Sequence, residues 1–105
     1  MDDDLSIHTS RDGSTAIVAA SGEIDLSSIG ELRSAVTHTA ADCERLRLDL
    51  SGVEFIDSTG LGGLLELRST LRARNIVLEI VAGDGPVRQA VEITGLSELL
   101  APAGK

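Results

Sequence analysis

Two periods of hydrophobicity occur along the chain, and each predicts a different kind of element. Residues 5–9 alternate apolar and polar side chains, and residues 14–22 form a second extended apolar run. Asp12 and Gly13 between them are a turn signal, so we expect an antiparallel hairpin. Residues 45–51 alternate strictly, which predicts a third strand that buries only one of its two faces.

Apolar residues spaced three and four apart predict helices after the second and third strands. The first helix buries a face that consists of Ile29, Leu32, Val36 and Ala40. Ser28, followed by Glu31, predicts a capping box at its start. We expect the second helix from about Ser58 to Arg74, with Arg68 extending its charged end from the edge of the apolar stripe to water. That stripe consists of Leu61, Leu64, Leu65, Leu67 and Leu71.

The last part of the chain predicts a fourth strand and a third helix. Residues 75–83 are mostly apolar, and Pro86 suits the first turn of a helix that begins near Asp84 or Gly85. The inward face of this helix should consist of Val87, Ala90, Val91 and Thr94. The residues expected to close the core after it are Leu96, Leu99 and Leu100.

The element order, β-β-α-β-α-β-α, predicts a single α/β domain over residues 1–105, with residues 1–4 as a flexible tail and residues 101–105 as a frayed end. Strands two to four are joined by helices, so they should be parallel, with right-handed crossovers that pack both helices on one face of a small mixed sheet. Glu23–Ser28 and Gly52–Gly63 then leave the same edge of the sheet, where α/β proteins place their sites.

Composition and charge exclude several classes of function. The formal net charge is −8, which repels nucleic acids and anionic membranes and favours a partner that presents Arg or Lys. Phe55 is the only aromatic residue and Cys43 the only cysteine, so the chain offers no stacking platform for bases and no internal disulfide. No apolar stretch reaches membrane-spanning length and the start lacks a signal-peptide pattern, so we expect a cytoplasmic protein without metal or cofactor.

The segment FIDSTGLGGLL, residues 55–65, carries the candidate chemistry. A nucleophilic Ser58 would need a base, but His8 and His38 lie on other elements, and Ile56 replaces the first glycine of the G-x-S-x-G elbow. A phosphate-binding loop would need G-x-x-x-x-G-K-[ST], which is absent. A phospho-aspartate receiver would need more βα units and a lysine near the last strand.

A fourth interpretation of the segment is a helix start that another protein recognises. Ser58 would be the N-cap, accepting a hydrogen bond from the N–H of Gly60 or Leu61. Capping does not account for Gly60, Gly62 and Gly63, since each glycine costs up to ~1 kcal/mol in a helix relative to alanine. We expect these glycines to form a smooth backbone surface that a partner approaches closely, which favours a binding module over an enzyme.

Three motifs, in order, resemble a known family. LDLSGVEFIDSTGLGGLL, residues 48–65, is similar to the signature of the STAS domain in bacterial anti-sigma-factor antagonists, in which a strand ends in D-[ST]-[ST]-G-[LIV]. GEIDLSS, residues 22–28, resembles the second motif of the family, and GPVRQAVEITGLSELL, residues 85–100, resembles its ending. The resemblance covers essentially the whole chain.

The resemblance implies a switched regulator in which Ser58 is the phosphate acceptor, Asp57 the acidic residue before it and Thr59 the neighbouring hydroxyl. The unphosphorylated protein would bind an anti-sigma factor, itself a serine/threonine kinase, and so free the sigma factor for transcription. Phosphorylation would block the contact surface with little refolding, and a metal-dependent serine phosphatase would restore binding. The implied partner-binding residues are Glu23, Asp25, Leu26, Ser27, Ser28, Asp57, Ser58, Thr59, Gly60, Leu61, Gly62 and Gly63.

Two other roles stay open for such a domain. One is a stand-alone STAS subunit of a membrane ABC-type transport system that contacts the ATPase, and the other is a scaffold in a stress-signalling assembly. The transport role needs no phosphorylation, so the acceptor hydroxyl at Ser58 favours the regulator. We expect a monomer when free, without direct contact to nucleic acid or membrane.

Overall fold

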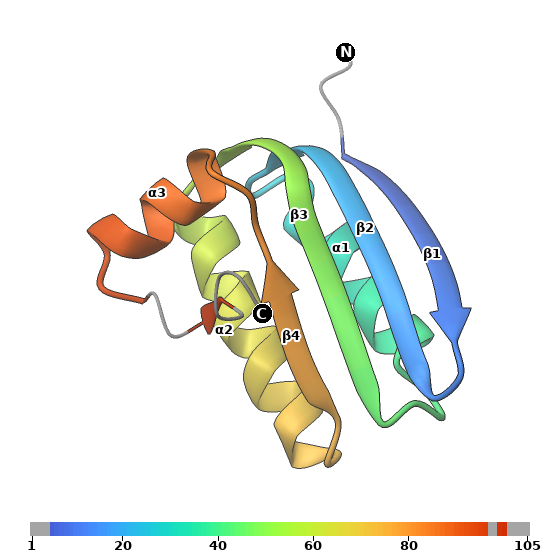
Figure 1. Cartoon of the computed structure of the whole chain (residues 1–105). Helices are drawn as coiled ribbons and strands as arrows, with labels where there is room; N and C mark the ends of the chain where they lie inside the picture. The colour runs from blue at the N-terminus through green and yellow to red at the C-terminus, as the bar shows by residue number, and fades with distance from the viewer. Residues whose placement is uncertain (1–4, 97–98, 101–105) are drawn as a thin grey trace.

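Four strands form one mixed sheet, in the same order in space as along the chain (Figure 1). Strands β1 (Ser6–Asp12) and β2 (Thr15–Ile24) are antiparallel, whereas β2 is parallel to β3 (Arg45–Ile56) and β3 to β4 (Val77–Val81). The predicted mixed sheet and the predicted order of elements are therefore confirmed.

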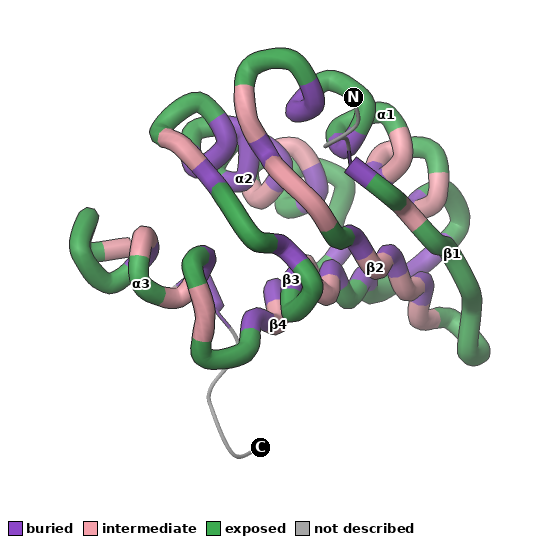
Figure 2. The backbone as a smooth tube through the Cα atoms, turned by 90° about the horizontal axis from the view of Figure 1, so that it is seen from above, coloured by how far each residue is buried: buried purple, intermediate pink, exposed green. Residues whose placement is uncertain are grey.

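The structure is a computed structural model that describes residues 5–96, 99 and 100. The tail expected at residues 1–4 and the frayed end expected at residues 101–105 lie outside the described residues. Helices α1 (Ile29–Thr39) and α2 (Ser58–Ala73) cover the same face of the sheet, as Figure 2 shows from above. The prediction of one covered face is confirmed for these two helices.

The third helix, α3 (Pro86–Ile93), packs against β3 instead of covering the sheet with the other two. Strand β3 is 12 residues long, and β4 pairs only with its first part, Arg45–Asp49. Beyond that point α3 lies beside β3 (Figure 1). Gly85 is the N-cap of α3 and Pro86 its first residue, as the sequence predicts.

The alternation along β3 separates a core face from an open face. Its three leucines, Leu46, Leu48 and Leu50, are buried beneath the helices. On the open face Arg45 and Arg47 each lie 3.3 Å from Glu79 of the neighbouring strand β4. Leu99 and Leu100 are buried and Leu96 packs against the core, so the predicted closure of the core by these leucines is confirmed.

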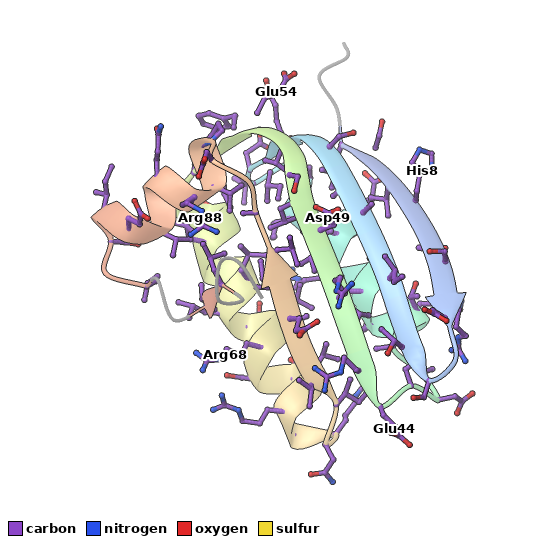
Figure 3. The ribbon with its side chains drawn as sticks, in the orientation of Figure 1. His8, Glu44, Asp49, Glu54, Arg68 and Arg88 are labelled. Atoms are coloured by element: carbon purple, nitrogen blue, oxygen red, sulfur yellow. The ribbon has the colours of Figure 1, made fainter. Side chains whose placement is uncertain are left out.

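Three predictions about side chains on the helices are wrong, and one holds. Leu65 is 37% exposed, because 3.6 residues per turn put it about 120° from the centre of the buried stripe of α2. Thr94 is exposed because it follows the end of α3, where its hydroxyl donates to the carbonyl oxygen of Ala90 at 2.9 Å. Ser28 makes no cap hydrogen bond to α1, so the capping box is not formed. Arg68 is half-buried and points outward from α2 as predicted (Figure 3).

Candidate functional site

The carboxyl ends of β2 and β3 meet at one edge of the sheet, and the chain turns into a helix after each. Both strands run further than the sequence predicts, because they continue to pair through two register shifts up to Ile24 and Ile56, which are partners. The loop expected over Gly52–Gly63 therefore shrinks to the single residue Asp57. Its N–H donates to the carbonyl oxygen of Ile24 at 3.2 Å, so the predicted neighbourhood of the two segments is confirmed.

Asp57, and not Ser58, caps helix α2. The backbone of Asp57 is extended, and its Oδ1 accepts a hydrogen bond from the N–H of Gly60 at 2.9 Å. Aspartate and serine are comparable N-caps, so the residue that caps is decided by where β3 stops. Ser58 is consequently the first helical residue, and the prediction that it caps the helix is wrong.

The hydroxyls of Ser58 and Thr59 are not committed to any hydrogen bond within the described residues, and both residues are exposed. They occupy the first turn of α2, whose leading backbone N–H groups have no partner inside the helix. The helix dipole favours negative charge at this position. The start of α2 thus presents accessible hydroxyls at a position where the backbone would tolerate an added anion.

The three glycines in the first turns of α2 have two different roles. A Cβ on Gly60 would lie 2.8 Å from Cγ2 and 2.9 Å from the carbonyl oxygen of Ile24, and a Cβ on Gly63 would overlap the side chain of Ile29. Both glycines are buried, and they let α2 approach β2 and α1 closely. A Cβ on Gly62, by contrast, would meet nothing within 4 Å. The smooth surface expected from all three glycines is therefore corrected to Gly62 alone.

The loop between β2 and α1 is closed by hydrogen bonds centred on Asp25. Its Oδ1 accepts from the N–H of Ser27 at 3.0 Å and from the Ser27 hydroxyl at 2.7 Å. Ser28 is buried, and its hydroxyl donates to the carbonyl oxygen of Glu23 at 2.8 Å and accepts from the N–H of Asp25 at 3.0 Å. The Ser27 hydroxyl lowers the pKa of Asp25 below its ordinary value of 3.8, because it stabilises the carboxylate.

Two large apolar side chains at this edge are exposed. Leu26, at the tip of the Asp25 loop, is 77% exposed, and Phe55, close to the end of β3, is 46% exposed. Phe55 was not among the residues predicted for the site, although its position two residues before Asp57 gave a signal. Glu54 beside it projects outward from the same end of β3 (Figure 3). The segments that lead from β2 into α1 and from β3 into α2 therefore each carry one large exposed apolar side chain.

Two further features bear on the class of protein. Among the residues that the structure describes, no three His, Cys, Asp or Glu side chains gather closely enough to hold a metal ion. Within the same part of the chain, no helix combines the length and the hydrophobicity that crossing a membrane requires.

Comparison with known proteins decides the family. A family model for the STAS domain matches residues 6–103. The chain belongs to the STAS-domain family. This STAS domain is 30% identical over 97 residues to an anti-sigma-B factor antagonist of Staphylococcus aureus (strain NCTC 8325 / PS 47), and the match covers 91% of this chain and 90% of that relative. The resemblance found in the three sequence motifs is confirmed.

Solved structures agree with this family. The crystal structure of an anti-sigma factor antagonist from Mycobacterium paratuberculosis matches with a TM-score of 0.84 and 28% identity, covering 98% of this chain and 88% of that one. The anti-sigma factor antagonist SpoIIAA in its unphosphorylated form matches with a TM-score of 0.75 and 17% identity, covering 95% and 90%. The Bacillus cell fate determinant SpoIIAA in the phosphorylated form gives 0.69 and 16%, covering 95% and 93%. Both SpoIIAA structures share the fold of this STAS domain.

Proposed function

We propose that this STAS domain is an anti-sigma factor antagonist that binds an anti-sigma factor with serine/threonine kinase activity, and that phosphorylation at Ser58 switches the binding off. Binding would free the sigma factor for transcription in the cytoplasm. The observation that carries the proposal is the state of the serines at the sheet edge. Ser27 and Ser28 use their hydroxyls inside the loop, whereas Ser58 is exposed and has no side-chain hydrogen bond among the described residues.

The surface proposed to contact the partner is the exposed and half-buried part of this edge. We call it the switch surface, and it consists of Glu23, Asp25, Leu26, Ser27, Asp57, Ser58, Thr59 and Gly62. The other residues expected to contact the partner, Ser28, Gly60, Leu61 and Gly63, are buried and support the surface from behind. Three carboxylates and no basic residue belong to the switch surface, which favours a partner with Arg or Lys at the interface.

A phosphate on Ser58 would act through charge and bulk. It adds about −1.5 to −2 charge at pH 7 next to the carboxylate of Asp57. The N-terminus of α2 would stabilise this charge by ~0.3–1 kcal/mol, so we expect the fold to persist. The shared fold of the two SpoIIAA structures supports this expectation. The phosphate would then weaken binding by occupying the surface that the partner must contact, and a metal-dependent serine phosphatase would reverse the effect.

The names of the relatives do not favour the transport-subunit role. The Staphylococcus aureus relative spans nearly the whole chain and is an anti-sigma-B factor antagonist, and the Mycobacterium paratuberculosis protein is an anti-sigma factor antagonist. The proposal for this chain follows the same regulatory class.

Binding measurements on three forms of the protein test the proposal. Wild type, Ser58→Ala and Ser58→Asp are titrated into candidate kinase anti-sigma factors by calorimetry. We expect wild type and Ser58→Ala to bind alike and Ser58→Asp to bind at least about tenfold more weakly, a loss of about 1.4 kcal/mol. Equal affinity of all three forms would contradict the switch. The chain has no Trp or Tyr, so concentrations are set by amino-acid analysis.

A further inference from the structure

We propose that Leu26 is an apolar anchor that inserts into a pocket of the anti-sigma factor, and that the Asp25–Ser28 turn is the rigid mount that presents it. The inference rests on the proposed function and specifies the chemistry of its partner. The pocket should be apolar at its centre and lined at its rim by Arg or Lys.

The exposure of Leu26 matters because of the turn that carries it. Leu26 is 77% exposed, and Ile93, the last residue of α3, is 84% exposed. Single exposed apolar residues are common on protein surfaces, so exposure alone distinguishes neither residue. Ile93 lies at the end of a helix that projects away from the strands (Figure 1). Leu26 lies between residues whose polar groups are bonded to one another.

The residues on both sides of Leu26 fix the turn. Oδ1 of Asp25 accepts from the N–H and the hydroxyl of Ser27, at 3.0 and 2.7 Å. The carbonyl oxygen of Asp25 accepts from the N–H groups of Ser28 and Ile29, at 3.1 and 2.8 Å. The Ser28 hydroxyl returns to Glu23 at 2.8 Å. The backbone that carries Leu26 is therefore held from strand β2 to helix α1.

A preorganised apolar side chain is an efficient binding group. Association loses the freedom of every segment that it orders, so a loop that is already ordered loses less. The energetically dominant residues of an interface are anchors that fill pockets and exclude water. The turn orders the backbone at Leu26 before any partner is bound, so an interface built on Leu26 would lose less backbone freedom.

The position and charge of the turn identify the occupant as the partner of the switch surface. The N–H of Asp57 donates to the carbonyl oxygen of Ile24, two residues before Leu26, so the anchor and Ser58 belong to one edge. Glu23 and Asp25 lie just before Leu26 in the sequence, and no basic residue lies in residues 21–32. A protein that covers this edge must therefore combine an apolar pocket with positive charge.

The geometry gives Asp25 a different role from Leu26. Oδ1 of its carboxylate accepts from the N–H and the hydroxyl of Ser27, so we assign Asp25 a positioning role that acts on the partner through the turn. An asparagine at this position keeps the oxygen that accepts from the Ser27 N–H, whereas an alanine removes it. The two substitutions therefore separate positioning from direct charge recognition.

The anchor is tested by comparing Leu26→Ala with Ile93→Ala, a matched loss of an exposed apolar side chain elsewhere. Affinity for the same kinase anti-sigma factor is measured by calorimetry, and thermal unfolding checks that both variants fold. We expect Leu26→Ala to raise Kd about tenfold or more and Ile93→Ala to leave it within about twofold. If wild type binds and Leu26→Ala binds equally well, the anchor is wrong while the proposed function stands. If wild type binds no candidate, both are wrong.

The role of the Asp25–Ser28 turn in presenting Leu26 is tested by Asp25→Asn and Asp25→Ala in the same calorimetric assay. We expect Asp25→Ala to weaken binding about as much as Leu26→Ala, because the turn loses its central acceptor. Asp25→Asn should retain most of the affinity and lower the salt dependence of binding only slightly, because Glu23 and Asp57 keep the surface acidic. Equal losses for the two variants, with a weaker salt dependence, would instead mean that the Asp25 charge contacts the partner directly.

Discussion

The two strand ends that meet at the switch surface begin alike and diverge within three residues. Strand β2 ends at Ile24 and is followed by Asp25, β3 ends at Ile56 and is followed by Asp57, and the two isoleucines are partners in the sheet. Each aspartate accepts a hydrogen bond from a nearby backbone N–H, that of Ser27 in one loop and that of Gly60 in the other. The serines then differ, since the hydroxyls of Ser27 and Ser28 are hydrogen-bonded, whereas that of Ser58 has no partner among the residues that the structure describes.

The difference follows from the length of the connection. Four residues, 25–28, separate β2 from α1, and their polar groups must satisfy one another to close the turn. Only Asp57 separates β3 from α2, so the helix begins at once and does not need the hydroxyl of Ser58. Two similar sequences thereby become a rigid loop and an accessible acceptor. The hydrogen-bond partners of a serine, rather than its presence in a motif, distinguish the two.

The largest predicted effect on stability comes from a side chain at Gly60, which would push α2 away from the end of β2. A Cβ there would lie 2.9 Å from the carbonyl oxygen of Ile24, so we expect Gly60→Ala to lower the free energy of unfolding by about 1–3 kcal/mol. Gly62→Ala is the matched control, since its Cβ meets nothing within 4 Å, and it should stabilise the helix by up to about 1 kcal/mol. Denaturant unfolding measures both. Equal destabilisation would contradict the close contact between α2 and β2.

A smaller effect should identify the residue that caps α2. Asp57→Ala removes the acceptor for the N–H of Gly60, so we expect a loss of about 1 kcal/mol in the free energy of unfolding. Ser58→Ala removes a hydroxyl without a partner among the described residues and should change stability by about 0.5 kcal/mol or less. Thermal and denaturant unfolding compare the two variants. A larger loss for Ser58→Ala would restore serine as the cap.

The smallest effect is the contribution of Asp25 to acid stability. Hydrogen bonding to Ser27 lowers its folded pKa below 3.8, so the folded protein binds fewer protons there than the unfolded chain. The stabilisation is present above pH 3.8 and is lost as the pH falls below 3.8 through the folded pKa. We expect the stability difference between wild type and Asp25→Asn to shrink over that range in unfolding curves. A difference that grows on acidification would mean that the sign is wrong.

Local patterns predict most of this fold and part of the site. Alternation and helical spacing predicted four strands and three helices, and the order of elements predicted that the two strand ends meet. Helical spacing alone also predicts that Gly62 lies opposite the buried stripe of α2, on a different face from Gly60 and Gly63. Residue type alone predicts one role for all three glycines, and only helical phase distinguishes Gly62 from the other two.

The errors at the site come from pairing between strands that no local pattern reveals. The sequence placed the end of the third strand near residue 51, whereas register shifts between β2 and β3 carry the pairing to Ile56. The helix begins at Ser58 as predicted, but the extended strand leaves Asp57 as the single residue before it, so Asp57 and not Ser58 is the cap. The capping box at Ser28 is absent because the Ser28 hydroxyl donates to the carbonyl oxygen of Glu23 in β2 and accepts from the N–H of Asp25.

The most direct test of the account is to find where phosphate is added. The protein is incubated with ATP and the kinase anti-sigma factor that binds it, and phosphate is mapped by mass spectrometry in wild type and in Ser58→Ala. The account predicts phosphate on Ser58, none on Ser27 or Ser28, and none at this edge in Ser58→Ala. Phosphate on Ser27 or Ser28, or undiminished incorporation into Ser58→Ala, would contradict the claim that the free hydroxyl of Ser58 is the switch.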